Sequence, residues 1–268
     1  MLPDYFLKLH TIVSRLFMIL VKDLFKQFDD HQVLNGVNLT VEKGETMVIM
    51  GGSGCGKSVL LKLIIGLLKP DKGVIWVDGT EATSLTEKQM DEVRKRFGMV
   101  FQSSALFDSL TVAENVGFSV SRHTDMTREQ ITDLVVEKLE LVGLSGTEGA
   151  MPVDLSGGMK KRVSLARAIS MNPEIILYDE PTTGLDPVTA AGIDSLIAEL
   201  HDRLKVTSLV VTHDMASAFS IGTRMAMMYD GVIIEEGTPG EFRRSTEPVV
   251  KRFLEPGAFG SEHREIKL

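Results

Sequence analysis

A glycine-rich segment that ends in lysine and serine constrains the fold of this chain more than any other feature. Its sequence fits the pattern G-x-x-x-x-G-K-[S/T]: Gly51-Gly52-Ser53-Gly54-Cys55-Gly56-Lys57-Ser58. It follows the short apolar run Met47–Met50 and precedes a helical pattern over Val59–Leu68. A strand, a glycine loop and a helix in this order predict a phosphate-binding loop within an α/β fold.

The residue types of this loop suit a nucleoside triphosphate. Glycines allow consecutive backbone N–H groups to point toward phosphate oxygens, and a helix that begins near Lys57 adds the positive end of its dipole. In loops of this kind the lysine ammonium contacts the β- and γ-phosphates, and the serine hydroxyl is a ligand of Mg²⁺. We therefore expect Lys57 to bind phosphate and Ser58 to bind the metal.

Two adjacent carboxylates supply the second part of the predicted site. Asp179 and Glu180 directly follow the apolar run Ile175–Tyr178, which is typical of a central parallel strand. At the end of that strand, Asp179 is expected to hold Mg²⁺. Side chains alternate along a strand, so Glu180 is expected to act on the attacking water, as general base or by orienting it.

Two single residues also follow apolar runs. Gln102 follows Met99–Phe101 and is a neutral candidate ligand for Mg²⁺ or for the attacking water. His213 follows Val210–Thr212 and is expected on the side of the sheet where the phosphates lie. A single histidine at a strand end is more often structural, so that interpretation of His213 stays open beside the functional one.

A second candidate anion site precedes the helical run Val163–Ser170. Ser156, Gly157 and Gly158 offer a hydroxyl and backbone N–H groups at the start of this helix. One nucleotide cannot easily use two such sites in one chain. The second site is therefore expected to serve a neighbouring molecule.

Composition excludes several classes of protein. The 268 residues are 43% hydrophobic and 25% charged, as in ordinary globular proteins, and no apolar run is long enough to predict a spanning helix. The net charge of −8 argues against nucleic acid as a partner, because binding it requires clustered cations. Cys55 is the one cysteine, so an internal disulfide is excluded and a reducing compartment is favoured.

The apolar pattern also indicates how the chain is organised. Strands are expected at Met18–Lys22, Val33–Val41, Val74–Val77 and Ser208–Val211. Residues 103–160 lack strand signals and are expected to form a helical insert, in which Ile131, Leu134, Val135, Leu139 and Val142 share one helix face. Residues 1–17 form either a basic amphipathic helix for a membrane or partner or, as we prefer, an extension that packs weakly, with Met18 an alternative start.

Six motifs in order resemble the ATP-binding subunit of an ABC transporter. They are the glycine loop, Gln102, Leu155-Ser156-Gly157-Gly158, Asp179-Glu180, Gly184-Leu185-Asp186 and His213. The similarity covers residues 18–250 and leaves 251–268 as a C-terminal tail. It implies an α/β fold with a P-loop NTPase (RecA-like) core, an antiparallel β subdomain and an inserted helical subdomain at about residues 103–160.

The resemblance also implies how a complete site is assembled. Two copies would form a head-to-tail homodimer with two ATP molecules between them. Residues 156–158 of one copy would complete the site that Lys57 of the other begins. Asp186 would contact the other copy across the interface, and His213 would respond to the γ-phosphate.

Two further contacts follow from the same resemblance. Phe28 stands where the family has an aromatic side chain under adenine, with Phe25 as a rival and core packing as the alternative. A groove beside Gln102 and Ala105–Leu110 would receive a short helix of an integral-membrane permease. Packing within the helical subdomain is the alternative for these apolar residues.

Two segments and one residue are similar to those of lipid-transport ATPases of the Mla type. They are the segments Val100–Val112 and Val250–Ala258 and the residue Met159. Such ATPases serve permeases paired with MCE-domain lipid-binding proteins and small accessory subunits, at the cytoplasmic face of the inner membrane. The resemblance therefore implies ATP hydrolysis with Mg²⁺ that powers phospholipid transport.

Three other functions are weighed against this one. The ATPase of a small-solute importer, such as one for amino acids, would share every catalytic residue. A soluble ABC ATPase outside transport would be expected to have a coiled-coil insert or a second nucleotide-binding half. A monomeric P-loop kinase would not need Ser156, Gly157 and Gly158.

Overall fold

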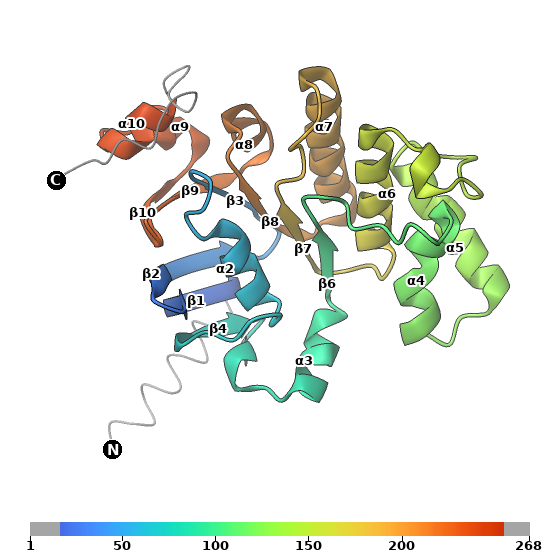
Figure 1. Ribbon diagram of the computed structural model, residues 1–268, viewed down its shortest axis with the longest axis horizontal. Coiled ribbons are helices and arrows are strands. Elements are labelled where there is room, and N and C mark those ends of the chain that lie inside the picture. The colour runs from blue at the N-terminus through green and yellow to red at the C-terminus, as the bar shows by residue number, and fades with distance from the viewer. Residues whose placement is uncertain (1–16, 255–268) are drawn as a thin grey trace.

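The computed structural model describes residues 17–254, which form two β-sheets and a lobe of helices (Figure 1). The strands are β1 (Phe17–Phe28), β2 (His31–Glu42), β3 (Thr46–Met50), β4 (Lys72–Val77), β5 (Thr80–Glu81), β6 (Phe97–Val100), β7 (Ile175–Asp179), β8 (Thr207–Thr212), β9 (Arg224–Tyr229) and β10 (Val232–Gly237). The α-helices are α2 (Lys57–Ile64), α3 (Glu87–Arg94), α4 (Val112–His123), α5 (Arg128–Leu141), α6 (Gly157–Ile169), α7 (Pro187–Leu204), α8 (Met215–Ile221), α9 (Pro239–Phe242) and α10 (Pro248–Leu254). Two 3₁₀ turns, η1 (Ala82–Ser84) and η2 (Pro152–Asp154), complete the described elements.

A six-stranded sheet lies at the centre, in the order β10-β9-β3-β8-β7-β6. Its strands are parallel except for β10, which pairs antiparallel with β9. Strands β3, β7 and β8 are buried along their whole length, because helices cover both faces of the sheet. Parallel strands end at one edge, so the residues that follow β3, β7 and β8 are brought together there.

Alternation along the strands separates the two faces of this sheet. On β3, Met47 and Ile49 belong to the apolar cluster that contains Leu60 of α2. Val48 and Met50 belong to the other cluster, which contains Val163 of α6 and apolar residues of α4, α5, α7 and α8. The helix after the glycine loop and the helix that begins with the second anion site therefore cover opposite faces.

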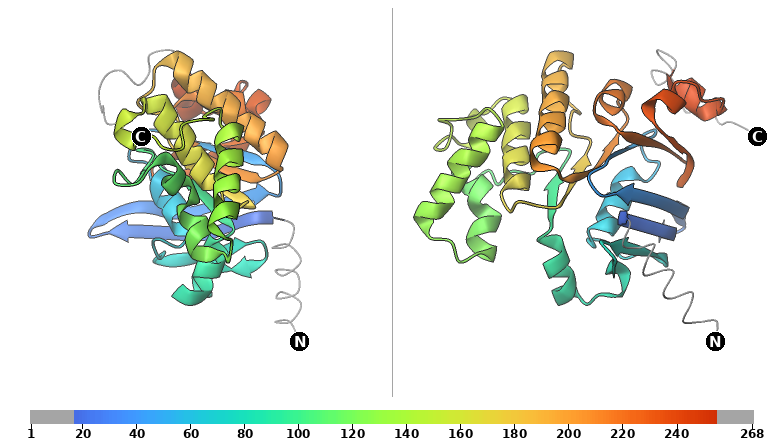
Figure 2. Two further views of the ribbon diagram at one scale, coloured as in Figure 1. Left: turned by 90° about the vertical axis from the view of Figure 1, so that its right-hand side faces the viewer. Right: turned by 180° about the vertical axis from the view of Figure 1, so that it is seen from behind.

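The second sheet and the helical lobe stand at different ends of the molecule. The antiparallel sheet has the order β2-β1-β4-β5 and lies beside α2, whereas α4, α5 and α6 gather at the other end (Figure 1). Figure 2 shows the same separation from behind. The sheet β2-β1-β4-β5 confirms the expected antiparallel subdomain. Residues 103–160 contain helices and no strand, which confirms the expected helical insert. No helix between residues 17 and 254 has the length and apolar character needed to cross a bilayer.

Helix α2 is shorter than its sequence pattern predicts. It ends at Ile64 rather than Leu68, and Gly66 follows with a φ of +70°. The Arg94 guanidinium donates hydrogen bonds to the carbonyls of Ile65 (3.2 Å) and Gly66 (2.8 Å), which stabilises this helix end. An arginine that lies far along the chain thus helps to fix where α2 stops.

The expected outer boundaries fall at the two ends of the described region. The extension expected at residues 1–17 lies outside it apart from Phe17, which begins β1. Helix α10 crosses the boundary expected at residue 250, and Val250 and Phe253 belong to the same apolar cluster as α6. The first residues assigned to the tail therefore pack on the domain, and residues 255–268 lie outside the described chain.

Gly98 permits close packing of α6 against β6 and gives a test of the core. A Cβ at this position would collide with the backbone carbonyl of Ala168. We expect Gly98→Ala to lower the free energy of unfolding by about 2 kcal/mol, because the helix backbone must shift. Urea unfolding measures this, with Gly149→Ala as the control, since nothing lies within 4 Å of a Cβ there. Equal stability of the two variants would contradict the packing described.

Candidate active site

The glycine loop joins β3 to α2 and folds around the lysine side chain. The Lys57 side chain is 6% exposed, and its ammonium donates hydrogen bonds to the carbonyls of Gly51 (2.8 Å) and Gly52 (2.9 Å). Gly54 and Gly56 have φ values of +81° and +108°, which side chains with a Cβ rarely adopt. The sequence therefore forms a tight turn whose lysine is held at the start of a helix, as phosphate binding requires.

Asp179 faces the helix that follows this loop. It continues the strand face of Ile175 and Leu177, which pack in the same cluster as α2. The Ser58 hydroxyl donates to its carboxylate at 2.6 Å, and Asp179 is itself buried. The two hard oxygen groups expected to bind Mg²⁺ are thus in direct contact across β7 and α2.

Glu180 reaches the same place by leaving the strand geometry. Simple alternation would direct it toward the α6 face, with Ile176 and Tyr178. Its φ is +49°, a left-handed conformation, and its carboxylate instead lies 3.6 Å from the Lys57 ammonium. The alternation of side chains along β7 therefore does not explain the position of Glu180. The left-handed backbone conformation at Glu180 directs its side chain toward Lys57.

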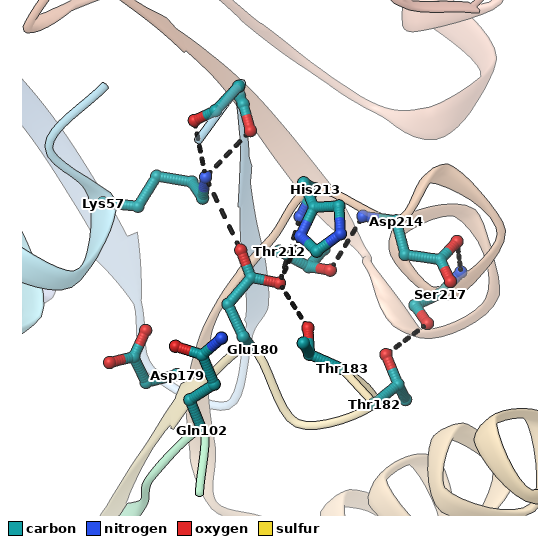
Figure 3. Close-up of polar contacts among 12 residues, drawn as sticks. Lys57, Gln102, Asp179, Glu180, Thr182, Thr183, Thr212, His213, Asp214 and Ser217 are labelled. Carbon is teal, nitrogen blue, oxygen red and sulfur yellow. Dashed lines mark hydrogen bonds and ion pairs between the residues drawn. The ribbon is translucent and has the colours of Figure 1, made fainter. Parts of the chain in front are cut away.

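His213 completes the contacts of this carboxylate. Its Nδ1 lies 2.8 Å from Glu180 Oε2, and its backbone N–H lies 3.4 Å from the same oxygen (Figure 3). The imidazole is 56% exposed, so it stands between the buried carboxylate and solvent. The Thr183 hydroxyl adds a third donor at 3.1 Å, a contact that sequence analysis missed.

Gln102 follows β6 on the neighbouring strand and is exposed. Figure 3 shows its side chain near those of Asp179 and Glu180. Its backbone carbonyl accepts a hydrogen bond of 2.6 Å from the ammonium of Lys161, which also donates to the Glu180 carbonyl at 3.3 Å. Lys161 is a second contact that sequence analysis missed, although it lies five residues after Ser156.

Among residues 17–254, no hydrogen bond or ion pair joins Ser156 or Asp186 to this cluster. Ser156 is the N-cap of α6, where its hydroxyl accepts from the N–H of Met159 at 3.3 Å. Asp186 is the N-cap of α7 and accepts from two backbone N–H groups, and bonds with Thr189 lower its pKa. Each of these two residues caps a helix of its own chain. Both are also exposed to solvent.

Two rival aromatic residues have different surroundings. Phe28 ends β1 and is 40% exposed, with the Lys26 ammonium 5.3 Å from its ring centroid. Phe25 lies against Gly36, where an added Cβ would be 3.2 Å from its ring. Exposure favours Phe28 as the ring available for stacking.

The oxygen donors fit a magnesium ion that is also bound by phosphate. Ser58, Asp179 and Gln102 offer a hydroxyl, a carboxylate and an amide, which suit a hard cation that retains water and phosphate ligands. Within residues 17–254, no group of three or more His, Cys, Asp or Glu side chains could hold a metal alone.

A phosphate loop beside an acidic strand end, on a parallel sheet with an inserted helical lobe, defines a nucleotide-hydrolysing P-loop protein. Residues 34–183 match the ABC transporter family, which is more than half of the chain. The chain belongs to the ABC transporter ATP-binding family and is an ATPase domain. Domains of this family work as dimers with a membrane permease.

Relatives with different names match most of the chain. The intermembrane phospholipid transport ATP-binding protein MlaF of Haemophilus influenzae is 43% identical over 88% of this chain and 90% of its own length. The probable ribonucleotide transport ATP-binding protein mkl of Mycobacterium leprae is 42% identical over 87% and 67%, respectively. The methionine import protein MetN of Carboxydothermus hydrogenoformans is 42% identical over 88% and 71%. This chain therefore spans only about two thirds of the mycobacterial protein.

A solved structure supports both the fold and the dimeric class. The dimeric ATP-binding cassette MJ0796, in a post-hydrolysis state bound to ADP and Pi, superposes with a TM-score of 0.77 at 33% identity. The match covers 83% of this chain and 99% of that chain. The P-loop core expected from the sequence is therefore confirmed.

Replacement of Glu180 by glutamine tests the carboxylate at the centre of the site. Glu180→Gln should lower kcat for ATP hydrolysis by about 10²-fold or more, because it removes a positioned base, while ATP still binds. Steady-state phosphate release and nucleotide binding measure the two effects. Glu174→Gln is the matched control, because Glu174 directly precedes the first residue of β7 and Glu180 directly follows its last. This variant should keep normal turnover. Normal turnover in Glu180→Gln would contradict the role of Glu180 as general base or as the residue that orients the attacking water.

Cys55 reports on the packing of the glycine loop. Its thiol is half-buried, and burial raises its pKa. Alkylation by N-ethylmaleimide should therefore be slow at neutral pH and accelerate as pH rises, because only the thiolate reacts. Modified protein should lose ATPase activity, and ATP should protect it. Full activity after complete modification, verified by mass spectrometry, would mean that the loop does not enclose phosphate.

Proposed function

We propose that this chain is the ATP-hydrolysing subunit of a transporter that moves phospholipid with an MCE-type permease complex. The observation that carries the proposal is the match to MlaF, which extends over about nine tenths of both chains. The segments 100–112 and 250–258 add the resemblance to Mla-type ATPases.

The site residues take the following roles in this proposal. Phe28 stacks on adenine, and the loop 51–58 surrounds the phosphates, with Lys57 on the β- and γ-phosphates. Ser58, Asp179 and Gln102 hold Mg²⁺, which supplies charge neutralisation at the phosphates when bound. The contacts of Asp179 with Ser58 and of Glu180 with Lys57 support this set.

ATP hydrolysis requires a water molecule that is positioned to attack the γ-phosphate and that loses a proton. Glu180 receives that proton or orients the water, because its carboxylate is buried and lies at the end of β7. His213 contacts Oε2 of this carboxylate, and its imidazole is exposed to solvent. In the proposal, this imidazole responds to the γ-phosphate. Gln102 aligns the same water from β6. These roles account for three strand ends meeting in one place.

A second copy of the chain completes each site. Helices α2 and α6 cover opposite faces of the sheet. This separation supports the proposal that residues 156–158 serve the site of a partner and not the site at Lys57 of the same chain. A head-to-tail homodimer brings these residues to the γ-phosphate, with Asp186 at the interface. The exposure of Ser156 and Asp186 supports this arrangement.

The permease is proposed to bind beside the 102–110 loop. Ala105 and Phe107 are exposed there, and the Phe107 ring packs on Phe118 of α4 with a centroid distance of 4.6 Å. This apolar surface adjoins Gln102, so a permease helix on it senses the nucleotide site. The chain then works at the cytoplasmic face of the inner membrane, together with an MCE-domain protein and an accessory subunit.

Import of a small solute is the second candidate. MetN matches this chain at similar identity, but this chain spans only 71% of it. Phospholipid transport is favoured by the resemblance of segments 100–112 and 250–258 to Mla-type ATPases.

The partners of the chain distinguish the candidates. Tagged Glu180→Gln protein, which retains its nucleotide, should be purified from its native membranes in mild detergent and its proteins and lipids identified by mass spectrometry. A multi-span permease, an MCE-domain protein and phospholipid are expected, because the ATP-bound dimer holds its complex. The wild-type protein without ATP is the control. A solute-binding protein in place of the MCE protein would indicate an importer, and the absence of a membrane partner would indicate a soluble ATPase.

A further inference from the structure

Lys161 is a buried cation that donates hydrogen bonds to backbone carbonyls of the site. Its side chain lies on α6 and is 4% exposed. The ammonium donates to the carbonyls of Gln102 (2.6 Å) and Glu180 (3.3 Å). Burial lowers its pKa, and the nearby carboxylates of Asp179 and Glu180 act in the opposite direction. A buried ammonium is costly, so contacts of this kind must compensate for its desolvation.

The backbone at Glu180 needs such support. Its φ of +49° is unfavourable for a residue with a side chain, and such conformations persist where several contacts fix them. Its N–H donates to the Val211 carbonyl at 3.0 Å, and its own carbonyl accepts from Lys161. The peptide groups on both sides of this residue are therefore held, by β8 and by α6.

The loop after Gln102 is held by the same helix. Ser104 and Ala105 have φ values of +63° and +46°, and the Arg167 guanidinium donates to their carbonyls at 2.7 and 2.6 Å. Lys161 and Arg167 lie six residues apart on α6 and bind this loop at two places. Of these two cations, Lys161 is the one that also binds Glu180.

We propose that Lys161 is a positioning residue for ATP hydrolysis, which fixes the backbones of Glu180 and Gln102 relative to each other and to α6. The inference rests on the catalytic role proposed above for Glu180. It adds a direct link between α6, whose N-cap is Ser156, and the two loops that carry Glu180 and Gln102. A change in the position of α6 then moves Glu180 and Gln102 together.

The role predicts a specific kinetic effect. Within residues 17–254, no hydrogen bond or ion pair joins Lys161 to Lys57 or to the glycine loop, so its loss should leave ATP binding unchanged. Displacement of a catalytic group by a fraction of an ångström to 1 Å costs about ten- to a hundredfold in rate. Lys161→Met, which keeps the length of the side chain, should therefore lower kcat about tenfold or more and change KM for ATP by less than about twofold.

Lys138 offers a matched control in the same lobe. It is also 4% exposed and donates to Asn172 Oδ1 and Glu137 Oε1 at 2.9 Å, away from the site. Lys138→Met should lower the melting temperature, as Lys161→Met does, and leave kcat unchanged. Lys161→Arg keeps the charge and several donors, so it should recover most of the lost kcat.

The experiment measures ATP hydrolysis by full-length protein against ATP concentration, with a melting curve for each variant. Normal kcat in Lys161→Met, or an equal loss in Lys138→Met, would overturn the inference. If Lys161→Met does not fold, Lys161→Gln is measured in its place, with the same expected loss. Glu180→Gln separates the two proposals: normal turnover in that variant refutes the site itself, whereas its inactivity beside a fully active Lys161→Met refutes only the role of Lys161.

Discussion

The site depends on one constraint, which is that parallel strands end at the same edge of their sheet. Strands β3, β7 and β8 are buried along their whole length, and their neighbouring strands and the helices on both faces hold them in place. The glycine loop, the two carboxylates and His213 each begin where one of these strands stops. Their contacts, from Ser58 with Asp179 to Glu180 with His213, follow from that shared edge.

The motifs predicted which side chains the structure brings into contact, because each combines a chemical pattern with a local structural one. A glycine loop between a strand and a helix specifies its own geometry, and an acidic pair after an apolar run specifies the strand end. The aim of Glu180 could not be derived in this way, since alternation directs it to the wrong face and only its positive φ corrects this. Lys161 was equally hidden, because a lysine among other basic residues gives no sign of burial.

The fold, too, has parts that local sequence patterns predict and parts that depend on contacts between distant segments. Central strands are visible as apolar runs, and the helical insert is visible as an absence of them. The end of α2 depends on Arg94, which approaches from another helix, and no local pattern encodes such a contact. Helix α10 is similar, because its place in the domain depends on packing of Val250 and Phe253 in a core built by distant segments.

The placement of α2 and α6 on opposite faces also affects reaction order. In the proposed dimer a complete site needs two chains, so free protein would hydrolyse ATP at a rate that rises with the square of its concentration while dimers are scarce. Two copies bound to one permease meet instead at a local concentration set by the geometry of that complex, about millimolar for short tethers. Assembly on the permease then makes turnover per complex independent of how much of the chain the cell contains.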